Sequence, residues 1–375
     1  MRVGLNLIFL VPGETGGMEV AARELVPALR AAAPGVELVG FFNREAQDDP
    51  LTAEVEAVTV PVRARNRVEW VRGEQQHLPR LARRAGVDVL HSLASTAPLW
   101  GAFARVVTVH DLIFRLHPEA HQGLRTRGMG LLVPLAARRS DRVIAVSRST
   151  RDDLVRHVGI AAAKVDVVPQ GMGAPARADP VPEARLRERH ALGSRAVVLS
   201  VSAKRPHKNL ARLLEALALI APERRPALVL PGYPTWHETE LRERARALGV
   251  EGDVRFLGWI DAAELEGLYA LAAAFVFPSL YEGFGLPVLE AMSRGVPVAT
   301  SDRSSLPEVA GDAALLFDPL SPRAIATAME TLLGDAQRAE RLRAAGRRRA
   351  AQFTWEATAA GTLDSYERAL RAPSS

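Results

Sequence analysis

The sequence predicts an α/β fold built from two doubly wound, parallel-sheet domains, and three observations carry this prediction. The chain has 375 residues, too many for one ordinary core and suited to two domains of roughly 150 to 200 residues each. Apolar residues make up 48% of the chain and charged residues 24%, as in a folded globular protein. Short apolar runs alternate with longer helical patterns in both halves, which is typical of parallel sheets covered by helices on both faces.

The apolar runs set the expected domain boundaries. In the first half they cover residues 3–10, 36–42, 87–92, 105–110, 141–147 and 164–169, with a helix expected at Glu19–Ala32. In the second half they cover residues 196–202, 226–232, 253–258, 273–279, 296–301 and 313–317. The stretch between the halves is rich in proline, alanine and charge. We therefore expect a first domain at 1–175, a linker at 176–192, a second domain at 193–351 and a closing segment at 352–375.

Composition excludes several classes of protein. The chain has no cysteine, which excludes disulfides, thiolate zinc sites and a cysteine nucleophile and fits a reducing compartment, so we expect a cytoplasmic protein. No small-residue cleavage site follows the apolar opening, and no window supplies the roughly 18 apolar residues of a membrane span. The formal charge of +5 suits phosphorylated ligands, anionic membranes or nucleic acid. Zinc-finger spacing and an aromatic RNA-binding motif are both missing, so we expect no nucleic-acid partner.

The richest loop reads YEGFGLPVLEAMSRG and begins at Tyr281. In open parallel sheets ligands bind outside the carboxyl ends of the strands, where this loop should lie. Its glycines allow a sharp turn and its proline suits the first turn of a helix, whose N-terminus can hold a phosphate without a metal. Glu290 would lean back toward that phosphate and accept hydrogen bonds from a ribose. Glu282 could bind sugar hydroxyls or face positive charge in a transition state. Equally, the two glutamates could be a solvated helix residue and a loop acid.

The residues EGFGLPVLEAM, followed by GVPV, resemble the E-x7-E signature of the retaining family 4 glycosyltransferases. That family has the GT-B fold, in which two Rossmann-like domains face a deep cleft, and the resemblance extends over nearly the whole chain. It implies that Glu282, Phe284, Gly285, Leu286 and Glu290 bind the donor, a nucleotide-diphosphate sugar.

The segment SAKRPHKNL resembles the family's phosphate-binding loop. The resemblance implies that Lys208 pairs with the donor diphosphate, and a lysine ammonium is a strong point-charge partner for phosphate. The family commonly has Gly-Arg where this chain has Ser202 and Ala203. Either Lys204 or Arg205 would then replace the missing arginine, and the sequence leaves the choice open.

Two loops of the first half also resemble the family. The segment VVTVHDL matches the pattern T-x-H-D-L, which implies that His110 contacts the donor sugar, although a lone histidine is more often structural. Asp111 could orient His110 or cap the following segment. The loop GETGGME resembles the Gly-Gly turn, in which Gly16 and Gly17 let the acceptor and the diphosphate approach the backbone. A purely structural tight turn is the alternative.

Three further segments resemble the family. The loop DRSSLPEV implies that backbone amides near Ser305 and Leu306 help to hold the donor. The segment RFLGW would flank the base, and the closing FTWEATA would open a helix that crosses back to the first domain. In VVPQG, Gln170 stands where asparagine is more usual.

The resemblance implies that the enzyme moves a hexose from the nucleotide to an acceptor hydroxyl with retained configuration. Glu282, His110 and Lys208 would be catalytic: the first two position the sugar, and the departing phosphate helps to deprotonate the acceptor. No D-x-D pair occurs near these loops, so we expect Lys208 and a helix N-terminus to replace a divalent metal, and no cofactor. Resemblance of the PHKNL loop favours a GDP-hexose such as GDP-mannose over a UDP-sugar, and we expect a glycan or glycolipid acceptor.

Alternatives stay open at this point. A nucleotide-sugar epimerase can share the same architecture, and a non-catalytic nucleotide-sugar binder would keep the donor site without turnover. Peripheral contact with an anionic membrane is a further option. Arg63–Arg72 and Arg125–Arg142 are rich in arginine, and Val68, Trp70 and Val71 could serve as apolar anchors, although such arginines more often form a solvated face.

Overall fold

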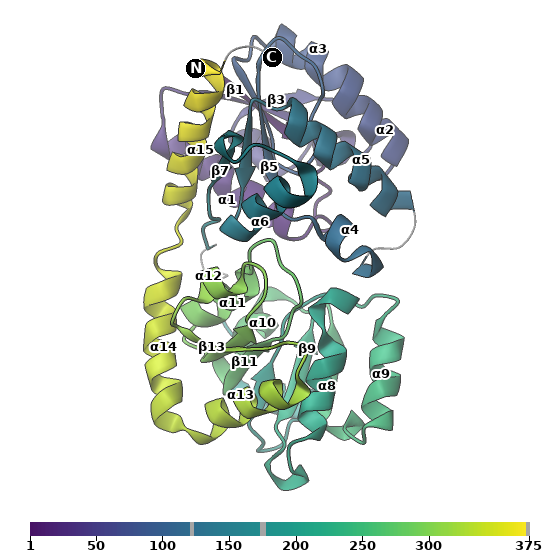
Figure 1. Ribbon diagram of the computed structural model, residues 1–375, viewed down its shortest axis with the longest axis vertical. Coiled ribbons are helices and arrows are strands. Elements are labelled where there is room, and N and C mark those ends of the chain that lie inside the picture. Colours follow the sequence, from purple (N-terminus) through teal and green to yellow (C-terminus); the bar gives the residue numbers. More distant parts are fainter. Residues whose placement is uncertain (121–123, 173–177, 373–375) are drawn as a thin grey trace. The chain divides into compact units, whose positions relative to one another are not determined.

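The structure, a computed structural model, describes residues 1–120, 124–172 and 178–372, and the chain divides into two compact units (Figure 1). Unit 1 comprises Met1–Gly173 together with Phe353–Ser375, and unit 2 comprises Ala174–Gln352. Each unit contains one parallel sheet with helices packed against it, so the predicted pair of Rossmann-like α/β domains is confirmed.

Unit 1 is built on a seven-stranded sheet in the order β3-β2-β1-β4-β5-β6-β7, and all neighbours run parallel. Its strands are β1 (Arg2–Leu7), β2 (Glu37–Phe42), β3 (Glu56–Thr59), β4 (Val89–Ser92), β5 (Ala104–Val109), β6 (Arg142–Ala145) and β7 (Val165–Val167). The sequence missed β3, because this short edge strand is mostly exposed and has no apolar run. The first strand ends at Leu7 instead of Leu10, since the following residues form a turn.

The helices of unit 1 are α1 (Gly17–Ala32), α2 (Arg67–Arg72), α3 (Leu78–Arg84), α4 (Ile113–Leu116), α5 (Leu124–Arg139), α6 (Arg148–Asp153) and α15 (Trp355–Arg371). Helix α15 packs along α1 and against β4, β5 and β6. It buries Trp355 and Tyr366 in the same core as Leu5 and Leu25. The closing segment of the chain is therefore an integral part of unit 1.

Unit 2 is built on a six-stranded parallel sheet in the order β10-β9-β8-β11-β12-β13. Its strands are β8 (Val197–Leu199), β9 (Ala227–Pro231), β10 (Val254–Gly258), β11 (Ala274–Phe277), β12 (Val298–Ser301) and β13 (Ala314–Phe317). Its helices are α7 (Glu183–Arg189), α8 (Leu210–Ala218), α9 (Glu238–Ala247), α10 (Ala262–Leu271), α11 (Leu286–Ser293), α12 (Leu306–Ala310), α13 (Pro322–Gly334) and α14 (Ala336–Ala350).

Part of the range 176–192, where the sequence suggested a linker, lies outside the described residues. The remainder contains α7, which packs on α10 and buries Leu186 completely. The sequence of this helix is mostly charged, so no pattern of apolar residues indicated a packed element there.

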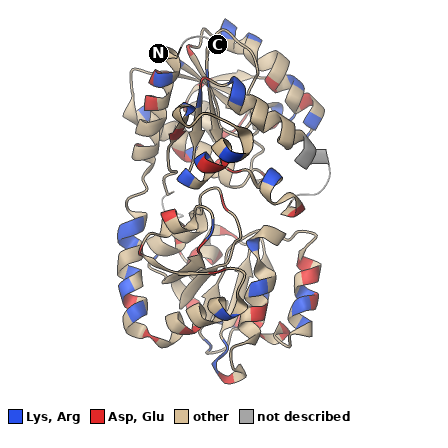
Figure 2. Cartoon of the chain, viewed as in Figure 1, with Lys and Arg blue, Asp and Glu red and all other residues tan. Residues whose placement is uncertain are grey.

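Basic and acidic residues are interspersed along the elements of both units (Figure 2). Of the expected membrane anchors, Val68 is exposed, but Trp70 is buried in the core of unit 1 and cannot serve as one. Arg142 is committed to an ion pair with Asp166, and the side chains of Arg125 and Arg127 lie outside the described residues. Within the part of the chain that the structure describes, no helix is long and apolar enough to span a membrane.

Candidate active site

The loops that follow β8 and β11 carry the main candidate residues of unit 2. These strands are neighbours at the point where the strand order reverses, which is where ligands bind in such sheets. The two loops are bonded together: Leu280 N donates to His207 O at 2.8 Å, and Asn209 Nδ2 donates to Pro278 O at 3.0 Å. Asn209 has a positive φ of 59°, a conformation that asparagine tolerates better than most residues. The bonds fix one loop against the other.

As a result, Lys208 and Glu282 meet in one ion pair. Lys208 Nζ lies 2.6 Å from Glu282 Oε1, and the side chains are only 16% and 10% exposed. The ammonium also lies over the ring of Phe277, 5.4 Å from its centroid. The sequence placed both residues in the site, but it gave no sign that they bind each other.

The turn formed by residues 283–285 starts α11. Gly285 has a φ of 119°, so the backbone conformation favours glycine here, and an added Cβ would lie 2.9 Å from Leu306 Cδ2. The N-cap residue is Gly285, which has no side chain that could cap the helix. The N–H groups and the positive dipole end of α11 can therefore serve an anion.

The hydroxyls of two serines bond to the backbone of the 283–285 turn. Ser305 is fully buried, and its Oγ lies 3.0 Å from Glu282 O and 2.6 Å from Phe284 O. Ser304 Oγ donates to Glu282 O at 2.5 Å. Leu306 is buried as well. The sequence expected Ser305 and Leu306 to act on the donor through their backbone. In the structure their side chains are buried against the turn and stabilise its conformation.

Glu290 lies on α11 and is anchored from α10. Tyr269 OH donates to Glu290 Oε2 at 3.0 Å, and burial raises the pKa of Glu290, although the nearby Arg294 opposes this rise. The guanidinium of Arg294 covers the Tyr269 ring at 4.6 Å and pairs with Glu266. Tyr269 thus orients Glu290, and no pattern in the sequence pointed to it.

The structure separates the two residues that could replace the missing arginine. Lys204 is fully buried, and its Nζ donates to Leu230 O at 2.7 Å and to Gly232 O at 2.8 Å. Burial lowers the pKa of Lys204 to about 8. Its ammonium is therefore committed to the carboxyl end of β9, where a phosphate cannot reach it. Arg205 is the half-exposed residue of the two.

Two exposed aromatic rings stack on each other beyond β9 and β10. Tyr233 and Trp259 have ring centroids 4.6 Å apart at an angle of 23°, and they are 42% and 68% exposed. Gly232 N donates to Gly258 O at 2.7 Å, which joins the two loops. The RFLGW segment, expected to flank the base, therefore ends in a ring that presents an open aromatic surface.

In unit 1, His110 follows β5 and is held by its neighbours. His110 Nε2 lies 2.7 Å from Leu93 O, and Gln170 Nε2 lies 3.4 Å from His110 Nδ1. Burial lowers the pKa of His110, so the ring is neutral at pH 7, donates through Nε2 and accepts at Nδ1. Asp111 Oδ1 accepts from Ile113 N at 2.9 Å, and the negative charge of Asp111 also acts on the ring of His110, so both roles of Asp111 stay open.

Gly16 and Gly17 lie at the start of α1, which follows β1 at the point where the strand order of unit 1 reverses. Gly16 has a φ of 59° and needs glycine for its conformation. Gly17 is the first residue of α1, and a Cβ added to it would meet no atom within 4 Å. Nothing within the described residues requires glycine at position 17, so the backbone there is open to approach.

Metal ligands do not gather anywhere in residues 1–120, 124–172 and 178–372, which contain no group of three or more His, Asp or Glu placed to hold a metal ion.

Comparison with known proteins agrees with this arrangement. The profile of the family "Glycosyl transferases group 1" matches residues 183–349, and that of "Glycosyltransferase Family 4" matches residues 15–172. The O-antigen chain mannosyltransferase B of Escherichia coli is 34% identical over 273 residues, 70% of either chain. A GDP-mannose-dependent alpha-(1-6)-phosphatidylinositol monomannoside mannosyltransferase of Mycobacterium tuberculosis is 34% identical over 288 residues, 72% of this chain and 71% of that one. The match to the serotype-specific mannosyltransferase WbdA of Escherichia coli spans only 34% of that longer protein.

A solved structure shares the fold. The sucrose-phosphate synthase of Thermosynechococcus elongatus superimposes with a TM-score of 0.76 at 23% identity over 98% of both chains. The family matches to both halves of the sequence and the 34% identical relatives show that the chain belongs to the group 1, family 4 glycosyltransferases, and the structural likeness shows that it has their GT-B fold.

Proposed function

We propose that this glycosyltransferase moves a hexose from a nucleotide-diphosphate sugar to a hydroxyl of a glycan or glycolipid, without a metal and with retention of configuration. The observation that carries the proposal is the Lys208–Glu282 ion pair beside the start of α11, whose N-cap residue is a glycine. GDP-mannose is the favoured donor and a UDP-sugar the alternative. Support comes from the mannosyltransferases among the relatives, one of which is named as GDP-mannose-dependent.

The donor diphosphate would bind at the N-terminus of α11. There it competes with Glu282 for the ammonium of Lys208, which lies within bonding distance of the carboxylate. Phosphate oxygens carry more charge than one carboxylate, so Lys208 would turn toward them. Glu282 would then be left to bind the hydroxyls of the transferred sugar. The ion pair thus holds both groups ready until the donor arrives.

For the transfer step we propose the same-face displacement that the family resemblance implies. The acceptor oxygen bonds to the anomeric carbon on the face from which the nucleotide departs. The bond from that carbon to the phosphate oxygen breaks, and its electron pair stays on the phosphate. The acceptor proton passes to the same phosphate oxygen. Lys208, Arg205 and the dipole of α11 stabilise the departing charge, which is the task of a metal in other transferases.

The remaining residues would bind the donor. Glu290, oriented by Tyr269, would accept hydrogen bonds from the ribose. The open face of Trp259 would lie against the base. His110 keeps the role that the resemblance implies, contact with the transferred sugar.

A transfer assay tests the proposal. The purified chain is incubated with GDP-mannose or UDP-glucose, oligosaccharide acceptors and EDTA, and the new glycosidic bond is examined by NMR. We expect transfer that EDTA does not reduce and a product with the anomeric configuration of the donor. An inverted product would contradict the retaining mechanism. Conversion of the donor sugar without an acceptor would indicate an epimerase, and donor binding without any product a non-catalytic protein.

Cytoplasmic localisation and peripheral contact with an anionic membrane stay predictions. Liposome flotation at low and high salt tests the membrane contact, because a contact made by arginines weakens as salt screens the charges.

A further inference from the structure

The proposed transfer reaction has no use for the ammonium of Lys204, yet this ammonium is buried inside unit 2. A charge in the interior is costly unless hydrogen bonds replace those that it made to water. Lys204 Nζ donates to Leu230 O at 2.7 Å and to Gly232 O at 2.8 Å, and Ser202 O lies 3.5 Å from it. Lys204 thus cross-links the chain that follows β8 to the end of β9.

Backbone hydrogen bonds continue the pairing of β8 and β9 past the ends of both strands. Ser202 N donates to Pro231 O and Lys204 N donates to Tyr233 O, each at 3.1 Å. The hydroxyl of Thr235 donates to Lys204 O. Lys204 therefore binds the segment at the end of β9 through its backbone as well as through its side chain.

Gly232 passes close to the chain that follows β8 and is bonded to the end of β10. Its φ is 124°, and an added Cβ would lie 2.2 Å from Ser202 O, so glycine is required here. Gly232 N donates to Gly258 O at 2.7 Å, next to a shift in the register of β10 against β9. The segment that Lys204 binds is therefore fastened to both neighbouring strands of the sheet.

The two bonded glycines are each followed by an exposed aromatic residue. Tyr233 follows Gly232, Trp259 follows Gly258, and the two rings stack on each other. The direction in which a ring projects depends on the backbone that carries it. The bonds at Gly232 and Gly258 therefore help to set the distance and the angle between the rings.

The bonds from the ammonium are charge-assisted. Burial lowers the pKa of Lys204 to about 8, so the side chain is mostly protonated at pH 7. The charges of Glu238 and Arg242, both on α9, act on this pKa in opposite directions. A hydrogen bond from an ionised donor is stronger than one from a neutral donor. Lys204 is thus suited to hold the carbonyl groups of Leu230 and Gly232 in place.

We propose that Lys204 is a positioning residue that fixes the end of β9 and thereby keeps Tyr233 and Trp259 in the arrangement that receives the nucleotide base. A surface that is ordered before binding loses less conformational entropy when the ligand arrives. This inference rests on the proposed function, because it needs a nucleotide donor whose base lies against Trp259. Lys204 acts through the backbone and does not contact the nucleotide.

Lys204→Met tests the proposal, because methionine keeps most of the side-chain volume and removes the ammonium. Two ligands separate the base from the phosphates: the one of GDP and UDP that the unchanged chain binds more tightly, and inorganic pyrophosphate, which has no base. Calorimetry gives both dissociation constants. We expect the constant of the nucleotide to rise about tenfold, as stacking on a base is weakened, and that of pyrophosphate to stay within about twofold.

The matched control is Lys164→Met in unit 1. The ammonium of Lys164 also donates to a backbone carbonyl, Arg138 O at 2.7 Å. This control should leave both dissociation constants unchanged. If Lys204→Met weakened pyrophosphate by the same factor as the nucleotide, Lys204 would act at the phosphates and the proposal would be overturned.

A double-mutant cycle distinguishes positioning from a general loss of folded protein. If Lys204 acts through the rings, Lys204→Met should cost little further nucleotide affinity in a chain that already carries Trp259→Ala. Losses that simply add in the double variant would contradict the proposal.

Thr235→Val is the second variant, for the case that Lys204→Met does not fold. It keeps Lys204 and removes the hydroxyl that donates to Lys204 O. Without ligand, amide hydrogen exchange at residues 230–235 and 258–259 should be faster than in the unchanged chain, and the dissociation constant of the nucleotide should rise about threefold. Unchanged exchange and affinity would show that these contacts do not order the end of β9.

Failure of this inference can be told from failure of the proposed function. If the unchanged chain bound neither nucleotide nor pyrophosphate, both would fail. If it bound a nucleotide and Lys204→Met bound that nucleotide equally well, only the inference would fail.

Discussion

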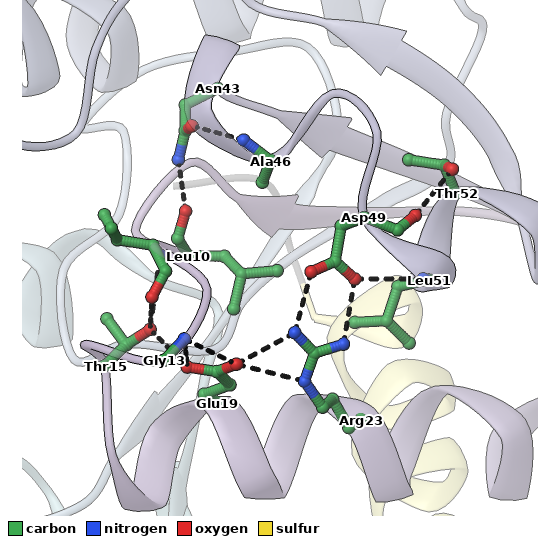
Figure 3. A network of polar contacts seen from close by, with 11 residues as sticks. Leu10, Gly13, Thr15, Glu19, Arg23, Asn43, Ala46, Asp49, Leu51 and Thr52 are labelled. Atoms are coloured by element: carbon green, nitrogen blue, oxygen red, sulfur yellow. Dashed lines mark hydrogen bonds and ion pairs between the residues drawn. The ribbon is translucent and has the colours of Figure 1, made fainter.

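Residues 13–17 of unit 1, here called the early turn, and the 283–285 turn of unit 2 do the same structural task by different chemistry. Each starts a helix where the strand order of its sheet reverses. The 283–285 turn is buried and is held by the neutral hydroxyls of Ser304 and Ser305, whereas the early turn is exposed and is held by the charges of Glu19 and Arg23 (Figure 3). Hydrogen bonds between neutral groups respond little to pH or salt, whereas ion pairs weaken as salt screens their charges. The 283–285 turn should therefore keep its shape over a wider range of pH and salt than the early turn.

The largest effect is expected at the ion pair of unit 2. Glu282→Gln keeps the shape of the side chain and removes its charge, so transfer should fall about 100-fold in kcat. Affinity for GDP or UDP should be unchanged or higher, because Lys208 no longer has a carboxylate partner. Steady-state kinetics and calorimetry measure both. Glu215→Gln, which loses a surface pair with Arg244, is the control. Near-normal transfer by Glu282→Gln would remove this residue from the catalytic set.

The stability of unit 1 should depend more strongly on pH than that of unit 2, because unit 1 contains Glu74. This residue is buried next to Asn6 and Thr96, whose side chains donate to Oε1 at 3.0 and 2.9 Å. Burial raises the pKa of Glu74 from 4.5 to about 7. The folded-state pKa is the higher one, so the stability from the neutral carboxyl is complete below about pH 4.5 and is lost as pH rises through 7.

Urea unfolding at pH 5 and pH 8 measures this loss. The unchanged chain should lose about 2.5 kcal/mol relative to Glu74→Gln over that interval. The variant cannot ionise at this position, so it supplies the reference. Parallel pH profiles for the two proteins would show that Glu74 is already ionised in the folded state at pH 5.

The hydrogen bonds from the serine hydroxyls of unit 2 should contribute somewhat less to the free energy of unfolding. This contribution should not depend on salt. Ser305→Ala removes the hydroxyl that lies 2.6 Å from Phe284 O, so the free energy of unfolding should fall by about 1–3 kcal/mol, equally in low and high salt. Ser293→Ala, which removes a hydroxyl bonded within α11, is the matched control. A cost that shrank in high salt would contradict the distinction between the two turns.

The smallest effects are expected at the paired glycines of unit 1. Gly16→Ala forces a side chain into a left-handed conformation and should cost about 1–2 kcal/mol of stability. Gly17→Ala should change stability by less than about 0.5 kcal/mol, since its Cβ meets open space at a helical residue, yet should raise the donor KM. Thermal unfolding and donor kinetics separate the two glycines. If Gly17→Ala left the donor KM unchanged, the diphosphate would not approach this backbone.

Local chemistry explains what the sequence could predict. The glycines and Pro287 specify a sharp turn and a helix start, and this placed Glu282 and Glu290 correctly on either side of the 283–285 turn. The alternation of apolar runs and helical patterns was enough to predict both parallel sheets. Edge strand β3 was not predicted, because it is short and mostly exposed.

Contacts between distant residues explain what the sequence could not predict. Lys208 and Glu282 are 74 residues apart, and Arg23 and Asp49 are 26 residues apart. The complete burial of Lys204 depends on backbone carbonyls of another strand, which have no side-chain signature. Such partners become visible only once the loops have been placed in space.

The most direct test of the central claim is thermal stabilisation by nucleotides. The unchanged chain and Lys208→Ala are heated with UDP, GDP, ADP or dTDP, each with EDTA and with magnesium, and the shift of the melting temperature is compared within each protein. A ligand that binds the folded state must raise its apparent stability. We predict a clear shift with one nucleotide, equal in EDTA and magnesium, and largely lost in Lys208→Ala. No shift with any nucleotide, or an equal shift in both proteins, would contradict a diphosphate site at Lys208 and the start of α11.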